Sequence, residues 1–278
     1  MKIYVDHNVM VGVTGYPRWA DADAELTHLI QLCHNGAQLV LSSQHIFELA
    51  KAGEERNVAA YCATVEQLRP EWANNPVAVR REELLRFLAK EQQAAILPDV
   101  RPFSPTSAQM WASYKGIGLA FLDDNFTRAV NALRRDRKAL DVVRGVARQT
   151  MDAIHTNRRS HRDGSMAIRK QEVEIDYFAR ALGRSHSDPD VLFLAGDVKS
   201  ARKNCQTIRV EHFLFEIRFK ENFTPEEGDA SDYQHALCGL PYCDAFVTDD
   251  RHFRESCVAI VRRANRKVQV LSRISEIR

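Results

Sequence analysis

The first fifty residues alternate between apolar runs and helical patterns in a β-α-β-α order. Lys2–Val5 is a β-rich apolar run, and Gln38–Leu41 predicts a second short strand. Between them, apolar residues over 20–33 recur at helical spacing. Ser42 or Ser43 is expected to cap the helix that follows the second strand. This order predicts a parallel sheet with right-handed crossover connections.

From about residue 54 to residue 223 the strand pattern almost disappears. Prolines divide the first part of this stretch into short helical segments. Apolar residues over 124–155 recur at helical spacing, which predicts one long amphipathic helix with arginines on its polar face. A further helix is expected over 166–182, whereas 191–194 and 197–205 fit either a strand or a helix.

Strand patterns return at 245–249 and 268–271, separated by a segment that fits a helix end or a β-branched strand. The predicted fold class is therefore α/β, with a doubly wound, mostly parallel sheet. We assign residues 1–53 and 224–278 to this core. Residues 54–223 are expected to form a large helical insertion or cap.

Four acidic residues lie at the ends of these predicted strands or on the adjacent helices. Asp6 follows the first strand, Glu48 lies on the helix after the second, Asp232 opens a later helix, and Asp250 follows the strand 245–249. Carboxylates at the C-terminal ends of strands in an open α/β sheet converge on one crevice. Oxygen ligands suit Mg²⁺ or Mn²⁺, and a bound ion would relieve the repulsion between like charges. The pattern predicts one metal site.

These acidic residues belong to segments with a family resemblance. VDHNV at 5–9, SSQHIFELAK at 42–51 and DYQHALCGLPYCDAFVTDDRHF at 232–253 resemble the PIN-domain nuclease family, over about a third of the chain. The resemblance implies a PIN-like sheet and assigns the catalytic, metal-binding acids of the family to Asp6, Glu48, Asp232 and Asp250. Thr248 corresponds to the threonine of the T-x-D motif, and Asn8 to a polar residue after the first Asp.

The resemblance implies a metal-dependent endoribonuclease in which metal-activated water hydrolyses a phosphodiester bond. A toxin of a toxin–antitoxin pair and a defence or stress-response effector both remain open, because the chain is about twice as long as the small toxins of the family. The alternative is a non-catalytic PIN-like module for RNA binding or assembly. An aspartyl-phosphate phosphohydrolase would need D-x-D where this chain has Asp6-His7-Asn8.

Further polar residues are expected to support the four acids. His235 follows Asp232 on the same helix face and is expected to orient its carboxylate. Asp229 fits either a helix N-cap or loop residue or a metal contact through water. Asp249 competes with Asp250 for the site, and the T-x-D match favours Asp250. The supporting residues that we predict are Asn8, Ser43, Asp229, His235, Asp244 and Thr248.

The distribution of charge points to a polyanionic partner. The whole chain has a net charge of +2, but residues 128–170 contain twelve Lys or Arg and four Asp, a net +8. A second basic cluster lies at 262–267. The alternative is that the arginines only form the solvated face of a helix. The residues expected to bind RNA phosphates are Arg134, Arg135, Arg137, Arg148, Arg158 and Arg159.

Composition excludes several classes of protein. With 45% apolar and 27% charged residues the chain resembles ordinary globular proteins, and no apolar run approaches the ~20 residues of a membrane span. The start of the chain lacks the pattern of a signal peptide. Six cysteines without a C-x-x-C pair favour neither a zinc site nor a disulfide framework. We therefore expect a cytoplasmic protein with no membrane contact. The resemblance implies an antitoxin or a second copy of the chain as a further partner.

Overall fold

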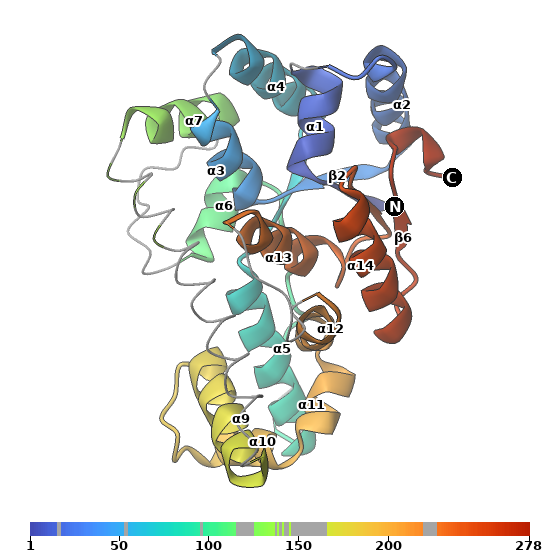
Figure 1. Ribbon diagram of the computed structural model, residues 1–278. Coiled ribbons are helices and arrows are strands. Elements are labelled where there is room, and N and C mark those ends of the chain that lie inside the picture. The colour runs from blue at the N-terminus through green and yellow to red at the C-terminus, as the bar shows by residue number, and fades with distance from the viewer. Residues whose placement is uncertain are drawn as a thin grey trace.

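A six-stranded sheet organises the molecule (Figure 1). The computed structural model describes residues 1–15, 18–52, 55–94, 97–114, 125–136, 138, 141, 145, 166–218 and 227–278, with only the backbone at 166–171 and 227. The strands are β1 (Lys2–Val5), β2 (Gln38–Leu41), β3 (Glu71–Ala73), β4 (Phe103–Ser104), β5 (Ala245–Val247) and β6 (Gln269–Leu271). Their order across the sheet is β4-β3-β2-β1-β5-β6, and every neighbouring pair is parallel except β3 with β4.

Helices cover both faces of this sheet. Side chains alternate between the faces of a strand, so Ile3 and Val5 join one buried cluster while Tyr4 joins the other. The first cluster receives side chains from α1 (His7–Thr14), α2 (Ala22–His34), α3 (Ser43–Lys51), α4 (Glu55–Leu68), α6 (Ser107–Ala112), α7 (Phe126–Arg135) and the 3₁₀ turn η1 (Ile274–Glu276). The second receives them from α12 (Gln206–Ile217), α13 (Glu227–Gly239) and α14 (Arg251–Arg263).

A third apolar cluster lies away from the sheet. It is formed by side chains of α5 (Pro76–Glu91), α9 (Met166–Leu182), α10 (Pro189–Gly196), α11 (Val198–Asn204) and the start of α12. Figure 1 shows α5, α9, α10 and α11 together at the end of the molecule remote from α1 and α2. These helices therefore have a small core of their own, and α12 connects that core to the sheet.

The prediction of an α/β fold with a mostly parallel sheet is confirmed. The sheet nevertheless extends into the range 54–223, which was expected to form a helical insertion or cap, because β3 and β4 lie within it. β3 has three residues and β4 has two, which is too short for a period of two to be visible in the sequence. The helix expected over 166–182 is present as α9, and the two ambiguous segments are helical, as α10 and α11.

The long helix predicted over 124–155 is wrong in its first half. Asn125 caps α7 by accepting from the Arg128 N–H, and the helix ends at Arg135 because Asp136 takes an extended conformation with φ −101° and ψ 93°. Most of 137–155 lies outside the described residues. The predicted strand 245–249 is shorter than expected, since β5 ends at Val247. In the part of the chain that the structure describes, no helix combines the length and the apolar character needed to cross a membrane.

Candidate functional site

The chain reverses its direction of progress across the sheet between β1 and β5. β2 and β3 lie on one side of β1, whereas β5 and β6 lie on the other. In open α/β sheets, ligands bind outside the carboxyl ends of the strands at such a switch point. Asp6 directly follows β1, and Asp249 and Asp250 follow β5 after Thr248. Asp6 and Asp250 are also the N-cap residues of α1 and α14, so two helices begin at this point.

Asp6 is fixed between the two strands. Its backbone N–H donates to the Val247 carbonyl at 2.9 Å, and its side chain is almost fully buried. The Thr248 hydroxyl donates to Asp6 Oδ2 at 2.8 Å. Thr248, one of the predicted supporting residues, therefore contacts the first of the four acids. His235 Nε2 lies 3.5 Å from the other oxygen, Oδ1.

Glu48 on α3 faces α13, where two residues one helical turn apart contact it. The Ser231 hydroxyl donates to Glu48 Oε1, and His235 Nε2 lies 3.1 Å from Oε2. Burial opposes ionisation of Glu48, but the charge and hydrogen bond of His235 outweigh it and hold the Glu48 pKa well below its usual range. Glu48 is therefore a carboxylate at neutral pH.

The same contacts shift the pKa of His235 upward. Burial disfavours its charged form, yet Asp6 and Glu48 together raise the pKa of His235 to about 9. The side chain is thus an imidazolium held between two carboxylates. Its other nitrogen, Nδ1, lies 2.6 Å from the Tyr4 hydroxyl, which is itself 2.8 Å from Ser42 Oγ. The prediction that His235 orients Asp232 is corrected, because its hydrogen bond goes to Glu48.

Asp232 instead pairs with an arginine. Arg218, which directly follows α12, places its guanidinium 2.5 Å from Asp232 Oδ2 and 2.8 Å from Asp229 Oδ1. Burial is the main reason that the Asp232 pKa is raised to about 7, and Arg218 only partly offsets it. Asp6 and Asp250 add to the rise, so both lie close enough to repel a charge on Asp232.

The start of α13 differs from the sequence expectation. The helix begins at Glu227, so Asp232 lies inside it rather than at its beginning, and Asp229 is neither an N-cap nor a loop residue. Asp229 is a buried helical residue that shares Arg218 with Asp232. The first half of α13 therefore places the carboxylates of Asp229 and Asp232 against the guanidinium of Arg218.

Asp249 and Asp250 both follow the end of β5, and they differ in environment. Asp250 is exposed, and its Oδ1 accepts from the Phe253 N–H at 2.7 Å. Asp249 is half-buried, and its pKa is raised by burial, then by Asp6 and Asp250. Since the strand has ended, the alternation of strand side chains does not separate the two residues.

Three further residues were predicted to support the acids, and the structure gives each a different environment. Asn8 is exposed on the first turn of α1, and the Ser43 hydroxyl lies 2.6 Å from that of Tyr114. Asp244 accepts from the Lys2 backbone N–H at 2.7 Å, at the opposite end of β5 from Asp250. The structure therefore does not bring Asp244 to the site, because the length of β5 separates it from Asp250.

Two of the arginines predicted to bind RNA are described. Arg134 donates to the Ala52 carbonyl at 2.8 Å and lies 3.4 Å from Glu55, so it ties α7 to the end of α3. Arg135 is exposed. The others, Arg137, Arg148, Arg158 and Arg159, lie outside the described residues.

The sequence analysis missed Arg218, Ser231 and Tyr4. Ser231 had a usable signal, because it stands four residues before His235 and shares its helix face. Strand alternation indicates that Tyr4 points to the other face of the sheet from Ile3 and Val5. Its contact with His235 could not be inferred, because the sequence does not show that α13 lies on that face. Arg218 had no signal, since nothing in its local pattern distinguishes it from a solvated arginine at a helix end.

Comparison with protein-family models, with curated proteins and with solved structures finds no match to this chain. Across the described residues, no three or more His, Cys, Asp or Glu side chains form a group that could hold a metal ion. The donor chemistry of Asp6, Glu48, Asp232 and Asp250 suits Mg²⁺ or Mn²⁺. In the present arrangement, however, His235 and Arg218 provide the positive charge that balances three of these carboxylates.

Proposed function

We propose that the protein is a Mg²⁺- or Mn²⁺-dependent nuclease that hydrolyses phosphodiester bonds in RNA. One observation supports this proposal above the others. Acidic side chains from four separate segments lie near the carboxyl ends of β1 and β5, where the sheet topology switches. His235 contacts two of them, Asp6 and Glu48, and the charges of Asp6 and Asp250 raise the pKa of Asp232. Crowded carboxylates are costly to fold together, and that cost is the usual mark of a site built for a cation.

Asp6, Glu48, Asp232 and Asp250 would hold the ion, which supplies an activated water and neutralises phosphate charge when bound. Thr248 fixes the orientation of Asp6 through its hydrogen bond. His235 holds a proton at Nε2 between Asp6 and Glu48 and keeps Glu48 ionised. The N-termini of α1 and α14 direct backbone N–H groups toward this end of the sheet, which favours a bound phosphate.

RNA as the substrate class comes from the resemblance to PIN-domain nucleases. The family likeness rests on the segments at 5–9, 42–51 and 232–253, and these segments supply the four acids. A cytoplasmic role as a toxin or as a defence effector follows from the same resemblance. An antitoxin or a second copy of the chain is the corresponding protein partner.

A second candidate function is favoured by Arg218. Its guanidinium bridges Asp229 and Asp232, and His235 similarly bridges Asp6 and Glu48. A protein that neutralises its own carboxylates in this way does not require an ion for stability. Such a molecule would be a PIN-like module that binds RNA or assembles with a partner without cleaving it.

Cleavage assays separate these two functions. Labelled single-stranded RNA, duplex RNA and DNA are incubated with purified protein in Mn²⁺, Mg²⁺ or EDTA, beside an Asp6→Asn variant purified identically. We expect metal-dependent cleavage of RNA by the wild-type protein and none by the variant, since an amide is a poor ligand for a hard cation. RNA binding without cleavage in either metal would favour the non-catalytic module. Equal cleavage by both proteins would contradict the site assignment.

A further inference from the structure

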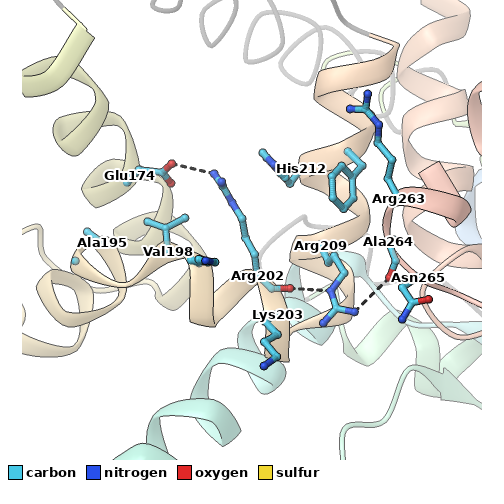
Figure 2. Close-up of a pocket in the computed structure, with 13 residues that line it drawn as sticks. Glu174, Ala195, Val198, Arg202, Lys203, Arg209, His212, Arg263, Ala264 and Asn265 are labelled. Atoms are coloured by element: carbon cyan, nitrogen blue, oxygen red, sulfur yellow. Dashed lines mark hydrogen bonds and ion pairs between the residues drawn. The ribbon is translucent and has the colours of Figure 1, made fainter. Parts of the chain in front are cut away.

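A basic cleft lies between the third apolar cluster and the C-terminal end of α14. It has a volume of about 910 Å³ and is lined by residues of α9 to α12 and of the segment 263–265. Five Lys or Arg side chains line it against one glutamate. Figure 2 shows Arg202, Lys203 and Arg209 from one part of the lining and Arg263 and Asn265 from the other.

Arg209 forms the centre of this cleft. Its Nε donates to the Arg202 carbonyl at 3.0 Å, and its Nη1 donates to the Ala264 carbonyl at 3.2 Å (Figure 2). These two carbonyls belong to the C-terminal ends of α11 and α14, where helix dipoles favour a cation. The contacts fix the plane of the guanidinium. A guanidinium held in this way keeps further N–H groups that suit bidentate recognition of phosphate.

The positive charge of the cleft is only partly balanced. Arg202 pairs with Glu174 at 3.0 Å, and Arg263 pairs with Glu216 at 3.1 Å. Over the part of the chain that the structure describes, Lys199, Lys203 and Arg209 have no carboxylate within ion-pair distance. Arg202, Lys203 and Arg263 lie in the last turns of α11 and α14, where they serve the dipoles of their own helices. Lys199 and Arg209, however, lie in the first turns of α11 and α12 and have no such role in theirs. The surplus charge favours a polyanionic ligand.

An aromatic ring adds a second kind of recognition. Phe213 lines the cleft and is half-buried, and its ring centre lies 5.1 Å from that of His212. Aromatic side chains beside cationic groups are the usual combination in sites for single-stranded nucleic acid, because unpaired bases stack on the rings. Duplex RNA hides its bases, so it would use the charge of the cleft but not Phe213.

α12 connects the cleft to the acidic site. Arg209 lies in the first turn of this helix and Arg218 follows its last residue, about 14 Å further along the axis. Arg218 pairs with Asp232 in the acidic cluster. An RNA strand held at Arg209 therefore lies about 14 Å along this helix from the arginine that pairs with Asp232.

We propose that this cleft binds single-stranded RNA, with phosphates at Lys203, Arg209 and Arg263 and a base against Phe213. The proposal rests on the proposed function in taking RNA as the polyanion. It adds a binding site at the opposite end of α12 from the acids, formed by α9 to α12 and the segment 263–265. The site holds the strand and takes no part in the hydrolysis.

Binding is measured by fluorescence anisotropy with a labelled single-stranded RNA in EDTA, so that cleavage cannot interfere. The cleft variant carries Lys199→Ala, Lys203→Ala and Arg263→Ala, which spares Arg209 and its helix contacts. The control variant removes the same charge from exposed positions outside the cleft and the acidic site, with Arg56→Ala, Arg81→Ala and Lys90→Ala. A third variant, Phe213→Leu, keeps an apolar side chain and removes the aromatic face.

We expect the cleft variant to bind more weakly and to lose about 1.4 units of the log–log salt slope, from about 0.7 for each of the two phosphate contacts at Lys203 and Arg263. The control variant should keep the wild-type slope. Phe213→Leu should weaken single-stranded binding about tenfold and leave duplex binding unchanged. Wild-type affinity and slope in the cleft variant, or equal loss in the control variant, would overturn the proposal. So would equal effects of Phe213→Leu on single strands and duplexes.

The outcome is separable from that of the proposed function. If RNA binding depends on the cleft but the protein cleaves no RNA in Mn²⁺ or Mg²⁺, the proposed nuclease function is contradicted and the proposed binding site is supported. If the cleft variant binds RNA like the wild-type protein and still cleaves it in the presence of metal, the nuclease function is supported and the proposed binding site is contradicted. Absence of any RNA binding by the wild-type protein would overturn the cleft proposal directly.

Discussion

Burial and neighbouring charges, rather than residue type, set the different pKa values of Glu48 and Asp232. Glu48 is fully ionised because His235 outweighs its burial, whereas the pKa of Asp232 is raised to about 7 because burial outweighs Arg218. Two carboxylates within one cluster thus differ greatly in acidity. Such a spread is common where side chains are arranged for function, although structural ion pairs produce it too.

Asp250 provides a test of catalysis that leaves stability intact. Asp250→Asn should abolish metal-dependent cleavage with an unchanged or raised Tm, because Asn caps a helix as well as Asp does and removes a like charge. Asp250→Ala should lose both cleavage and about 1 kcal/mol of stability. Activity assays and thermal melts measure the two effects. Loss of cleavage in Asp249→Asn but not in Asp250→Asn would move the ligand to the neighbouring residue.

His45 provides a test of pH dependence. Its Nδ1 accepts from the Ser42 N–H at 3.0 Å and its Nε2 donates to the Val5 carbonyl at 2.7 Å, so the buried ring is neutral. Burial is the main cause that lowers the His45 pKa to about 3. The unfolded chain, with a pKa of about 6.5, binds a proton at higher pH than the folded state does. The stability that the neutral ring provides is therefore complete above pH 6.5 and is lost as the pH falls toward 3.

The matched variant is His45→Gln, whose amide can both accept and donate but does not titrate. Denaturant unfolding at pH 7, 6, 5 and 4 should show a steeper acid loss in the wild-type protein than in the variant. Parallel acid slopes in the two proteins would contradict the assignment of a buried neutral His45.

At the scale of elements, α12 and α13 are joined by a buried polar network. Glu211 on α12 accepts from Arg80 Nη1, with contacts of 2.8 and 2.6 Å, and from the hydroxyls of Tyr177 and Tyr233. Tyr233 is adjacent to Asp232, so the network that fixes α13 also fixes the position of a proposed ligand. The helices of the range 54–223 thus contribute to the geometry of the site.

Removing one member of this network should be costly. Arg80→Met leaves the buried Glu211 charge without its cation, which we expect to destabilise the protein by about 3–5 kcal/mol. The double variant Arg80→Met/Glu211→Met should lose less than the sum of the two single variants, because it leaves no unpaired charge. Urea unfolding of the four proteins gives the coupling energy. Additive losses would mean that the pair contributes little.

Gly239 tests how closely α13 lies on the sheet. A Cβ at this position would meet Phe246 Cδ2 at 2.5 Å and Tyr4 Cγ at 2.9 Å, and both rings are fully buried. Gly239→Ala should therefore cost about 1–3 kcal/mol. Gly228→Ala, in the same helix with open space around it, should instead be neutral or stabilise by about 0.5–1 kcal/mol. Thermal melts that rank the two variants equally would contradict this packing.

At the scale of the whole molecule, the acidic cluster at the switch point and the basic cleft lie at opposite ends of α14. Asp250 caps the start of the helix, and Arg263 lies at its end. The positive charge of the cleft would direct a polyanion there rather than to the carboxylates. The two sites therefore need not compete for one ligand.

The effect of a bound ion on stability tests the proposed metal site without any assay of activity. An ion that binds only the folded state stabilises it, by about 2.7 kcal/mol at a concentration 100 times its Kd. Mn²⁺ should therefore raise the Tm of the wild-type protein, and EDTA should reverse the rise. Asp6→Asn should show little or no rise. An equal shift in both proteins would place the ion elsewhere.

The sequence by itself determined the elements whose pattern is long or repeated. Apolar periodicity located β1, β2, α2 and α9, and strand-end positions singled out Asp6 and Asp250. Such signals are local, because a strand or helix shows its buried face within a few residues. β3 and β4 were too short to carry one, and the interruption at Asp136 had no strong helix-breaking residue to mark it.

Only the tertiary structure decided the partners of those residues. His235 contacts Glu48 across 187 positions of sequence, and the Arg218 that pairs with Asp232 comes from a different helix. The convergence of α11, α12 and α14 into one basic cleft likewise depends on how distant helices pack. Charge and hydrogen-bonding capacity belong to a residue, but burial and neighbours, which set its pKa and its partner, belong to the fold.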